Sequence, residues 1–437
     1  MRVINMAVIY YGIHRKFIKS HIKEWINITG EPVCFSVKDE SLTNFKDKLL
    51  LEKYSVVSMD EALKKYPDAN VWVTYADRVN AIKAGKRLLK KVHPSKIHFL
   101  EANLEYRIGC GRLGRSFQYN NRNISMCTIG NRRRPFVAAS GSISQVIAKW
   151  KEFSTKLIDA NQLGSPNRCF GCPLLKWSFW PKVVKCTNLR FLQDHAKDAC
   201  NLKCIYCNAA NDGRWVKLKT VDRATTHDVI KEFYEMPEYV EMGKEFSITF
   251  ANGELLVNIY FKEIMEILLK TEWTIELISN LSVYREELSE LLRTGRVKHV
   301  ITSIDAGTRE TFKKIKRNDR FDKVVENLHR YPFDKTKLYL KYIFLEGIND
   351  NKQDVDGYYA IAKEVGATIQ LSADNHTNKA PFTQNEQMRK MVLRLIRKAK
   401  ADGIRVVADA NNINAEDVQF ITENYRNAQR EVENDDT

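Results

Sequence analysis

The stretch ACNLKCIYC, residues 199–207, places three cysteines within eight residues at the spacing C-x3-C-x2-C. Iron–sulfur clusters and structural zinc sites usually take four protein ligands, and this run supplies Cys200, Cys204 and Cys207. A zinc site would need a fourth ligand, for which His195 is a candidate, although it lies in the polar segment QDHAKD. The spacing therefore predicts a metal site and leaves open whether the protein fills its fourth position.

Strand and helix patterns alternate around and after this run. Amphipathic helical segments such as NIYFKEIMEILLK separate short apolar strands. The strand candidates are LRFLQ, EFSITF, WTIELIS, VKHVITSI, LYLKYIF and TIQLS, with GIRVVAD as a further strand. This repetition predicts a partial (β/α)6 TIM-like barrel over residues 187–425, with functional residues at the carboxyl ends of its strands. The acidic end, residues 426–437, is expected to fray.

The first 105 residues show a second alternation of strands and helices. The strand-like run VINMAVIYYG precedes the helix-like run HRKFIKSHIKEWIN, and SLTNFKDKLLLEKY, residues 41–54, predicts a second helix with Ser41 as its N-cap. The pattern predicts a Rossmann-like or flavodoxin-like α/β domain over residues 1–105. Residues 106–186 lack periodicity but contain many aromatic residues, so we expect a packed connecting region there.

Composition points to a soluble globular protein of the cytoplasm. Of the 437 residues 44% are hydrophobic, and no apolar run reaches the roughly 18–20 residues that span a bilayer. The nine cysteines are odd in number, and six of them lie between Cys169 and Cys207, a pattern typical of metal binding in a reducing compartment and not of a disulfide framework.

The charge balance gives a first indication of the partner. Lys and Arg outnumber Asp and Glu by 70 to 54, which gives a net charge of +16. Such a charge favours an anionic partner: a nucleic acid, a nucleotide-linked substrate or an acidic membrane surface. Scattered lysines on solvated helix faces would give the same total, so the charge alone does not choose a partner.

The cysteine run, with Tyr206 immediately before its last cysteine, closely resembles the signature of the radical S-adenosylmethionine (SAM) superfamily. The resemblance implies a [4Fe–4S] cluster on Cys200, Cys204 and Cys207, with the fourth iron left for the amino and carboxylate groups of SAM. It also implies a reductant such as flavodoxin or ferredoxin. Reductive cleavage of SAM would then give methionine and a 5′-deoxyadenosyl radical that abstracts hydrogen from a substrate.

Later strand ends carry the same resemblance. The segment ITFANGELL ends a strand with Asn252, Gly253 and Glu254, similar to the family's Gly-Gly-Glu motif for the SAM amino group. A small residue lets the backbone approach a ligand, and a carboxylate suits an ammonium group. Asn252 stands where the family usually has glycine, which leaves open which groups touch SAM there.

The next strand ends carry polar residues where the family places contacts to the SAM ribose or carboxylate. Lys341 and Glu346 are further groups that could face the site. The contacts that the resemblance implies are Ser279, Asn280, Ser303 and Asp305. Each is also compatible with a polar residue that caps a strand.

A second group of cysteines lies upstream. Cys169 and Cys172 form CFGC, a spacing common in metal-ligand turns, and Cys186 follows. These thiols could bind a second Fe–S cluster, with Cys110 or Cys127 as the fourth ligand. Zinc and a set of buried free thiols are the alternatives.

The expected function is therefore hydrogen abstraction by a radical SAM enzyme from an anionic small molecule, such as a sugar nucleotide or phosphorylated metabolite. Modification of RNA or of a peptide is the first alternative, although no RNA-binding module is recognisable. A non-catalytic metal-binding scaffold is the second. The reaction outcome, whether epimerisation, dehydration, methylation or bond formation, is not given by spacing, nor is the fate of SAM.

Overall fold

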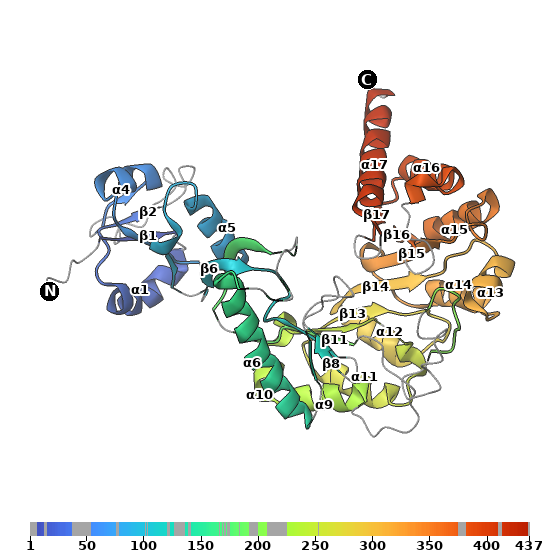
Figure 1. Ribbon diagram of the computed structural model, residues 1–437, viewed down its shortest axis with the longest axis horizontal. Coiled ribbons are helices and arrows are strands. Elements are labelled where there is room, and N and C mark those ends of the chain that lie inside the picture. Colours follow the sequence, from blue (N-terminus) through green and yellow to red (C-terminus); the bar gives the residue numbers. More distant parts are fainter. Residues whose placement is uncertain are drawn as a thin grey trace. The chain divides into compact units, whose positions relative to one another are not determined.

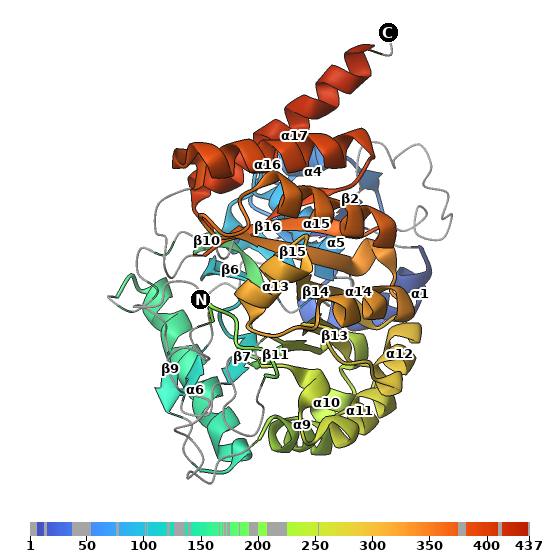
Figure 2. The ribbon, with the colours of Figure 1, turned by 90° about the vertical axis from the view of Figure 1, so that its right-hand side faces the viewer.

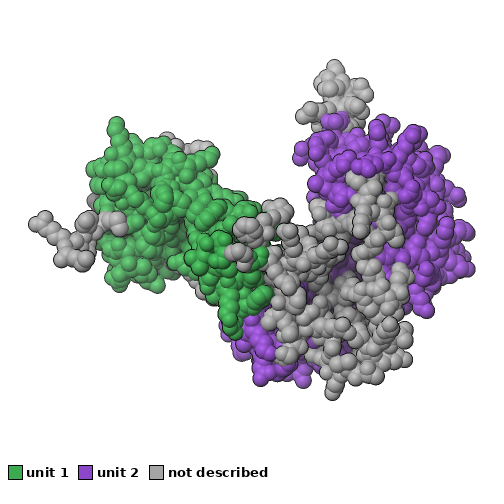
Figure 3. Space-filling model, viewed as in Figure 1, with its two compact units in different colours: residues 1–114, 151–185 green, residues 115–150, 186–437 purple. Residues whose placement is uncertain are grey.

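The computed structural model describes residues 7–12, 15–36, 54–75, 78–100, 102, 104–119, 123–125, 136–138, 141–165, 167, 169, 172, 175–182, 184–191, 200–207, 225–251, 253–374, 382–409 and 413–435. The chain divides into two compact units (Figure 3). Unit 1 comprises residues 1–114 and 151–185, and unit 2 comprises residues 115–150 and 186–437. The stretch 106–186, expected to connect two domains, is thus shared between the units.

Unit 1 contains a five-stranded parallel sheet in the order β3-β2-β1-β4-β5. Its strands are β1 (Val8–Tyr11), β2 (Cys34–Ser36), β3 (Val56–Val57), β4 (Asn70–Val73) and β5 (Ile97–Phe99). The connecting helices are α1 (Arg15–Thr29), α4 (Met59–Lys65), α5 (Arg78–Leu88) and the short 3-10 helix η1 (Pro94–Lys96) (Figure 1). The predicted parallel α/β arrangement is confirmed. The helix predicted over residues 41–54, with Ser41 at its start, lies outside the described residues except for Tyr54.

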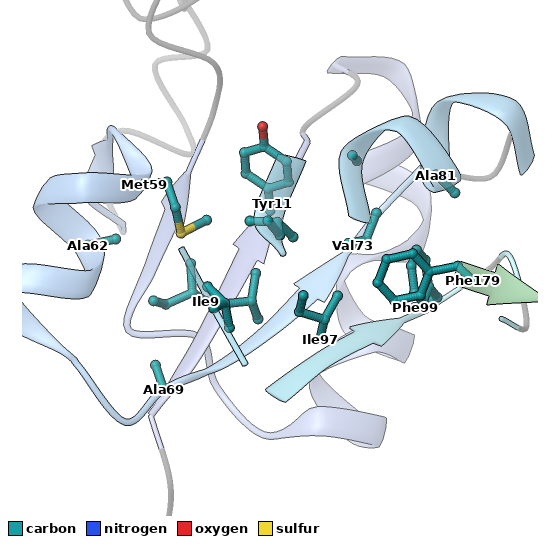
Figure 4. Packing of buried hydrophobic residues seen from close by; sticks show 14 of the residues in the cluster. Ile9, Tyr11, Met59, Ala62, Ala69, Val73, Ala81, Ile97, Phe99 and Phe179 are labelled. Carbon is teal, nitrogen blue, oxygen red and sulfur yellow. The ribbon is translucent and has the colours of Figure 1, made fainter. Parts of the chain in front are cut away.

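Both faces of this sheet are buried, as is usual for parallel sheets. On one face, residues of β1, β4, α4 and α5 pack with Phe99 and Phe179 (Figure 4). On the other, the Tyr10 ring lies edge-on to Trp25 and Phe35, with ring centroids 5.9 and 5.4 Å away. The helix pattern of α1 and the strand pattern of β1 thus meet in one core.

A two-stranded antiparallel ribbon completes unit 1. It pairs β6 (Leu104–Gly109) with β10 (Lys176–Pro181), and Gly109 lies opposite Lys176. Between these two strands the chain passes through β7 (Ser116–Tyr119), β8 (Asn123–Ser125) and β9 (Phe136–Ala138) of unit 2. It then forms α6 (Ile143–Gln162), whose residues belong to both units.

Unit 2 is built on a ten-stranded sheet in the order β17-β16-β15-β14-β13-β12-β11-β7-β8-β9. The strands from β17 to β7 pair in parallel, whereas β8 and β9 pair antiparallel at one edge. The remaining strands are β11 (Asn188–Phe191), β12 (Ser247–Phe250), β13 (Thr274–Ile278), β14 (Val297–Ser303), β15 (Leu338–Phe344), β16 (Thr368–Ala373) and β17 (Val406–Ala408). Each overlaps a predicted strand, and β11 and β16 extend one residue beyond theirs.

Helices follow the strands of unit 2 and lie along one face of the sheet (Figures 1 and 2). They are α9 (Thr226–Glu235), α10 (Pro237–Val240), α11 (Phe261–Lys270), α12 (Glu286–Arg293), α13 (Arg309–Lys316), α14 (Phe321–Arg330), α15 (Lys352–Val365), α16 (Glu386–Ala401) and α17 (Ala415–Asp435). Residues 426–435, expected to fray, continue α17. In the part of the chain that the structure describes, no helix is long and apolar enough to cross a membrane.

Candidate active site

The parallel strands of unit 2 have one apolar and one polar face. Successive side chains of a strand point to opposite faces, and the apolar set packs against helices. Phe117 of β7 contacts Trp150 of α6, and Tyr342 of β15 contacts Tyr358 of α15, with ring centroids 5.9 and 4.6 Å apart. This packing identifies the side of the sheet that the helices cover.

The opposite face, here called the polar face, carries charged and hydroxyl side chains in register. Arg190 of β11 lies opposite Thr249 of β12, which lies opposite Glu276 of β13, and the Thr249 hydroxyl donates to Glu276 Oε2 at 3.1 Å. Farther along, Ser303 of β14 lies opposite Lys341 of β15. A sheet face with this many polar groups suits a ligand better than a packed apolar core.

The segment 200–207, here called the cysteine loop, is pinned to the end of α13. The backbone amides of Lys203 and Ile205 donate to the carbonyls of Lys316 and Ile315 at 3.1 and 2.9 Å. The last carbonyls of a helix have no intrahelical partner, so the cysteine loop satisfies two of them. Ile205 also packs with Ile315 and Ile343. These contacts fix the loop beside the end of β15.

Polar contacts also surround Cys200. Its sulfur accepts from the Leu202 amide at 3.4 Å and from Asn280 Nδ2 at 3.6 Å. The Asn280 amide group also donates to Asn201 Oδ1 at 2.9 Å, and Asn201 Nδ2 donates to Ser282 Oγ at 2.8 Å. The cysteine loop is therefore joined to the end of β13 by side-chain hydrogen bonds.

The thiols of this loop suit iron or another soft metal. Burial, and next the nearby Glu254 carboxylate, raise the pKa of Cys200 to about 12. Burial also raises the pKa of Cys204. Bound metal deprotonates such thiols because its positive charge stabilises the thiolate. Three thiols with an amide N–H and an Asn side chain directed at one sulfur match the donor set of a cluster held by cysteines.

Within the described residues, no three His, Cys, Asp or Glu side chains converge closely enough to hold a single metal ion. A cubic cluster differs from a single ion because each cysteine binds a different iron. His195, the candidate fourth zinc ligand, lies outside the described residues.

The end of β12 carries a buried carboxylate. Glu254 is 2% exposed, and its Oε1 accepts from Ser279 Oγ at 2.7 Å and from the Leu256 amide at 3.1 Å. Its Oε2 accepts from the Asn280 amide at 2.5 Å. Gly253 before it has a φ of +70°, a backbone conformation that glycine adopts without strain. Burial raises the pKa of Glu254, and these hydrogen bonds oppose the shift.

Asp305 lies at the centre of a second network. Its side chain is fully buried, and Oδ1 accepts from the Ile343 amide at 2.8 Å. Oδ2 accepts from the Tyr206 hydroxyl at 2.6 Å and from Lys316 Nζ at 2.5 Å. Lys316 Nζ also donates to the Tyr206 hydroxyl at 2.7 Å. We call Tyr206, Asp305 and Lys316 the buried triad.

Burial shapes the protonation of the buried triad. It would lower the pKa of Lys316, but the adjacent Asp305 carboxylate and Cys204 raise it above the usual value. Burial, and then Asp305, raise the pKa of Tyr206 well above its usual value. The triad therefore contains an ammonium, a carboxylate and a neutral phenol, and its two charges are hydrogen-bonded to each other.

The structure brings together most of the predicted SAM contacts and adds one residue that was missed. Gly253, Glu254, Ser279 and Asn280 meet at neighbouring strand ends, and Asn252 lies outside the described residues. Tyr206 and Asp305 are joined by a hydrogen bond. Lys316 was missed, although a lysine in the apolar stripe of α13, after Phe312 and Ile315, is a signal that could have found it.

The two further candidates differ in their surroundings. Lys341 Nζ lies 2.6 Å from Asp409 Oδ2, and both side chains are largely buried. Ser372 Oγ donates to the same oxygen at 3.3 Å. Glu346 is exposed and accepts from Asn385 Nδ2 at 2.8 Å. Lys341 therefore belongs to the polar face, whereas Glu346 accepts from the residue that caps α16.

The upstream cysteines divide between the units. In unit 1 the Cys172 amide donates to the Cys169 carbonyl at 3.0 Å, and the Leu175 amide donates to the Cys172 carbonyl at 3.1 Å. Cys110 directly follows Gly109, which lies opposite Lys176, so the ribbon brings Cys110 near this turn. Cys186 belongs to unit 2, where it is buried and its thiol donates to the Asn188 carbonyl at 3.6 Å. Cys127 lies outside the described residues.

Comparison with known families identifies the domain to which this site belongs. The family model described as the radical SAM superfamily matches residues 197–359, which include the cysteine loop, Glu254, Asp305 and Lys316. This segment is a radical SAM domain.

The sequence identity to individual curated proteins and solved structures is low. The chain is 22% identical over 189 residues to GTP 3′,8-cyclase of Clostridium botulinum, a match that covers 42% of this chain and 56% of the relative. The chain therefore spans about half the length of the curated relatives it matches.

Two solved structures are similar at lower identity. SuiB of Streptococcus suis bound to SAM has a TM-score of 0.40 and 10% identity, and the match covers 62% of this chain and 57% of SuiB. A radical SAM methyltransferase of Sphaerobacter thermophilus has a TM-score of 0.36 and 16% identity, with 49% of this chain and 64% of that one covered.

Proposed function

We propose that unit 2 binds a [4Fe–4S] cluster through Cys200, Cys204 and Cys207 and binds SAM beside it. The observation that carries the proposal is the network in which Asn280 contacts both Cys200 and, through its amide, Glu254. It joins the cysteine loop to the strand ends that resemble the family's SAM-binding motif. When bound, the cluster and SAM supply the one-electron chemistry that generates a substrate radical.

The residues of the chain would hold and orient these groups. Gly253 would let the backbone approach SAM, and Ser279, Asn280 and Ser303 would offer hydrogen bonds to its amino acid or ribose groups. Glu254 accepts hydrogen bonds from the Ser279 hydroxyl and from the amides of Leu256 and Asn280. For Glu254 and Asp305 we therefore propose mainly that they position neighbouring groups, with any direct contact to SAM made by the remaining lone pairs.

We also propose an architecture for each of the two units. In unit 2 the proposed architecture is a partial TIM-like barrel whose polar face lines the inside, at the carboxyl ends where barrels place their chemistry. In unit 1 the strand order β3-β2-β1-β4-β5 supports a Rossmann-like module, since this order reverses between β1 and β4 as doubly wound sheets do. The boundaries at residues 105, 186 and 425 remain predictions.

We propose an anionic small molecule as the substrate, bound on the polar face. Arg190 and Lys341 are cations on this face, in register with hydroxyl groups that can bind phosphate or sugar oxygens. The curated relatives are named for a reaction of GTP, a polyanionic nucleotide, which is the same chemical class. The net charge of +16 agrees with it.

Modification of RNA or of a peptide is the alternative that the net charge also permits. A long polyanion would bind with a steep dependence on salt, because each phosphate contact releases a counterion. A small nucleotide would show a shallow one. A metal-binding scaffold without catalysis is the third candidate, and it predicts no turnover of SAM in any condition.

A second metal site stays a proposal. We propose that Cys169, Cys172 and Cys110 supply three ligands in unit 1, because the ribbon pairing brings them near one another. A cluster is favoured over zinc since these thiols lie upstream of the radical SAM domain. We further propose a flavodoxin or ferredoxin as the reductant, as the radical SAM domain implies, and the cytoplasm as the location, because clustered cysteines suit a reducing compartment.

Anaerobic incubation of the reconstituted protein with SAM and dithionite tests this function. We expect 5′-deoxyadenosine, and we expect its amount to rise with the true substrate in a panel of nucleoside triphosphates, sugar nucleotides, RNA and peptides. Replacing Cys200, Cys204 and Cys207 together by Ala should abolish the product. A filled cluster with no 5′-deoxyadenosine would favour the scaffold.

A further inference from the structure

The buried triad joins the cysteine loop to two other segments of the chain. Tyr206 stands between Cys204 and Cys207, Asp305 follows β14, and Lys316 closes α13. Both charged side chains are at most 2% exposed. A buried lysine is expensive unless it is paired and hydrogen-bonded. Packing alone would be served by an apolar residue at this place in the apolar stripe of α13.

We propose that the buried triad positions and electrostatically adjusts the cluster: Lys316 places a fixed positive charge beside Cys204, while Asp305 and Tyr206 hold that charge and the cysteine loop in place. The proposal rests on the proposed cluster on Cys200, Cys204 and Cys207. Lys316 is a positioning residue in this account, since it acts on the cluster through its charge and its contacts.

The electrostatic role depends on the charged side chain that lies close to Cys204. Lys316 Nζ donates to the hydroxyl of Tyr206, two residues after Cys204, and the Lys316 carbonyl accepts from the amide of Lys203, the residue before Cys204. Reduction adds an electron to the cluster, and the potential of an Fe–S cluster depends on nearby charge, hydrogen bonds and burial. A fixed cation close to one ligand should therefore favour the reduced state.

The positioning role depends on hydrogen bonds that hold the cysteine loop. The Tyr206 hydroxyl donates to Asp305 and accepts from Lys316, and the carbonyl of Lys316 accepts from the Lys203 amide. The side chain and the main chain of Lys316 thus hold the loop on both sides of Cys204. These contacts are made by protein groups alone, and we propose that they hold the loop in one conformation for the cluster.

Substitutions of Lys316 and Asp305 should shift the midpoint potential of the cluster in opposite directions, which a purely structural role would not predict. In K316M the buried carboxylate loses its counterion, so the midpoint potential of the cluster should fall. In D305N the ammonium keeps its charge and the carboxylate is gone, so the potential should rise. We expect each shift to reach at least tenfold in the one-electron reduction equilibrium, about 59 mV. EPR-monitored redox titration of the full-length reconstituted protein measures both.

Two further variants keep the test decisive. K316M leaves a buried carboxylate without its partner and could fail to fold, whereas the double variant K316M/D305N removes both charges, and its potential should lie between those of K316M and D305N. If K316M does not fold, the direction of the D305N shift relative to the double variant decides. Lys314 is an exposed lysine of the same helix. The variant K314M should change the one-electron reduction equilibrium of the cluster by less than threefold.

Amide hydrogen exchange in the cluster-free protein tests the positioning role of the buried triad. In the cluster-free protein, Y206F should accelerate exchange of the Lys203 and Ile205 amides about tenfold, and K314M should not. Unchanged exchange in Y206F would overturn the positioning role. Shifts of K316M and D305N in the same direction, or no shift in either, would overturn the electrostatic role while the cluster assignment stands. A wild-type protein that takes up no cluster would instead contradict the proposed function.

Discussion

At the scale of single residues, Glu254 shows how one buried carboxylate organises the site. It binds the hydroxyl of Ser279 and the amides of Asn280 and Leu256, and it thereby ties the end of β12 to the end of β13. Three donors to one buried carboxylate compensate for its removal from water. Asn280, oriented in this way, directs its side chain at Cys200.

The variant E254Q should be destabilised and should bind SAM more weakly. In either orientation its new amide faces a backbone N–H, of Asn280 or of Leu256, so a buried donor loses its acceptor. We expect a loss of about 1–3 kcal/mol in the free energy of unfolding. Urea denaturation and SAM binding to the reconstituted protein measure the two effects. The matched control is E263Q on the exposed face of α11; equal stability of both variants would contradict this role of Glu254.

Sequence reasoning succeeded at the residue scale where a spacing or a strand end marked the position. The cysteine spacing and the polar strand ends predicted most residues that the structure brings together. It missed Lys316 because a lysine near the end of a helix is usually solvated, and its burial depends on Asp305 and Tyr206, which lie 11 and 110 residues away in the chain. Only the tertiary fold sets such a contact.

At the scale of elements, a cluster of charges joins α15 to α16. Asp356 accepts from Arg394 Nε and Nη2 at 2.8 and 2.7 Å and from Lys398 Nζ at 3.0 Å. The hydrogen bonds from Arg394, and next those from Lys398, lower the pKa of Asp356 to about 2, against its desolvation by burial. A bidentate arginine–carboxylate contact is among the stronger surface ion pairs.

The variant D356N should lose about 1 kcal/mol of stability at neutral pH, an amount reduced by the partial exposure of the pair. A lowered pKa stabilises the fold above the ordinary aspartate range, near 3.8, and this contribution is lost as the pH falls toward about 2. The difference from the wild type should therefore shrink in acid. Urea denaturation at pH 7 and pH 3 measures it, with the exposed Glu386 as the site of the control E386Q. A constant difference at both pH values would contradict the ion-pair explanation.

At the scale of the whole molecule, long-range pairing decides the division into units. Strand β10 pairs with β6 across about 70 residues, and β7 to β9 extend the sheet of unit 2 from within the same interval. Local periodicity carries no information about such pairing. The sequence therefore predicted the alternating strands and helices well, but described residues 106–186 only as a connector.

Iron content tests the proposed second site at this scale. After anaerobic reconstitution we expect more than four irons per chain, because a single [4Fe–4S] cluster accounts for only four. Replacement of Cys169 and Cys172 by Ala should bring the content to about four and leave the cluster of unit 2 in place. A wild-type content of about four would contradict the second cluster.

The central claim is that three cysteines hold the cluster and SAM completes its fourth iron. The most direct measurement is electron–nuclear double resonance on the reduced, reconstituted protein with SAM labelled by 15N at its amino group and by 17O at its carboxylate. We predict hyperfine coupling to both labels, absent in a sample with unlabelled SAM. A reduced cluster that binds SAM without coupling to either label would contradict the account.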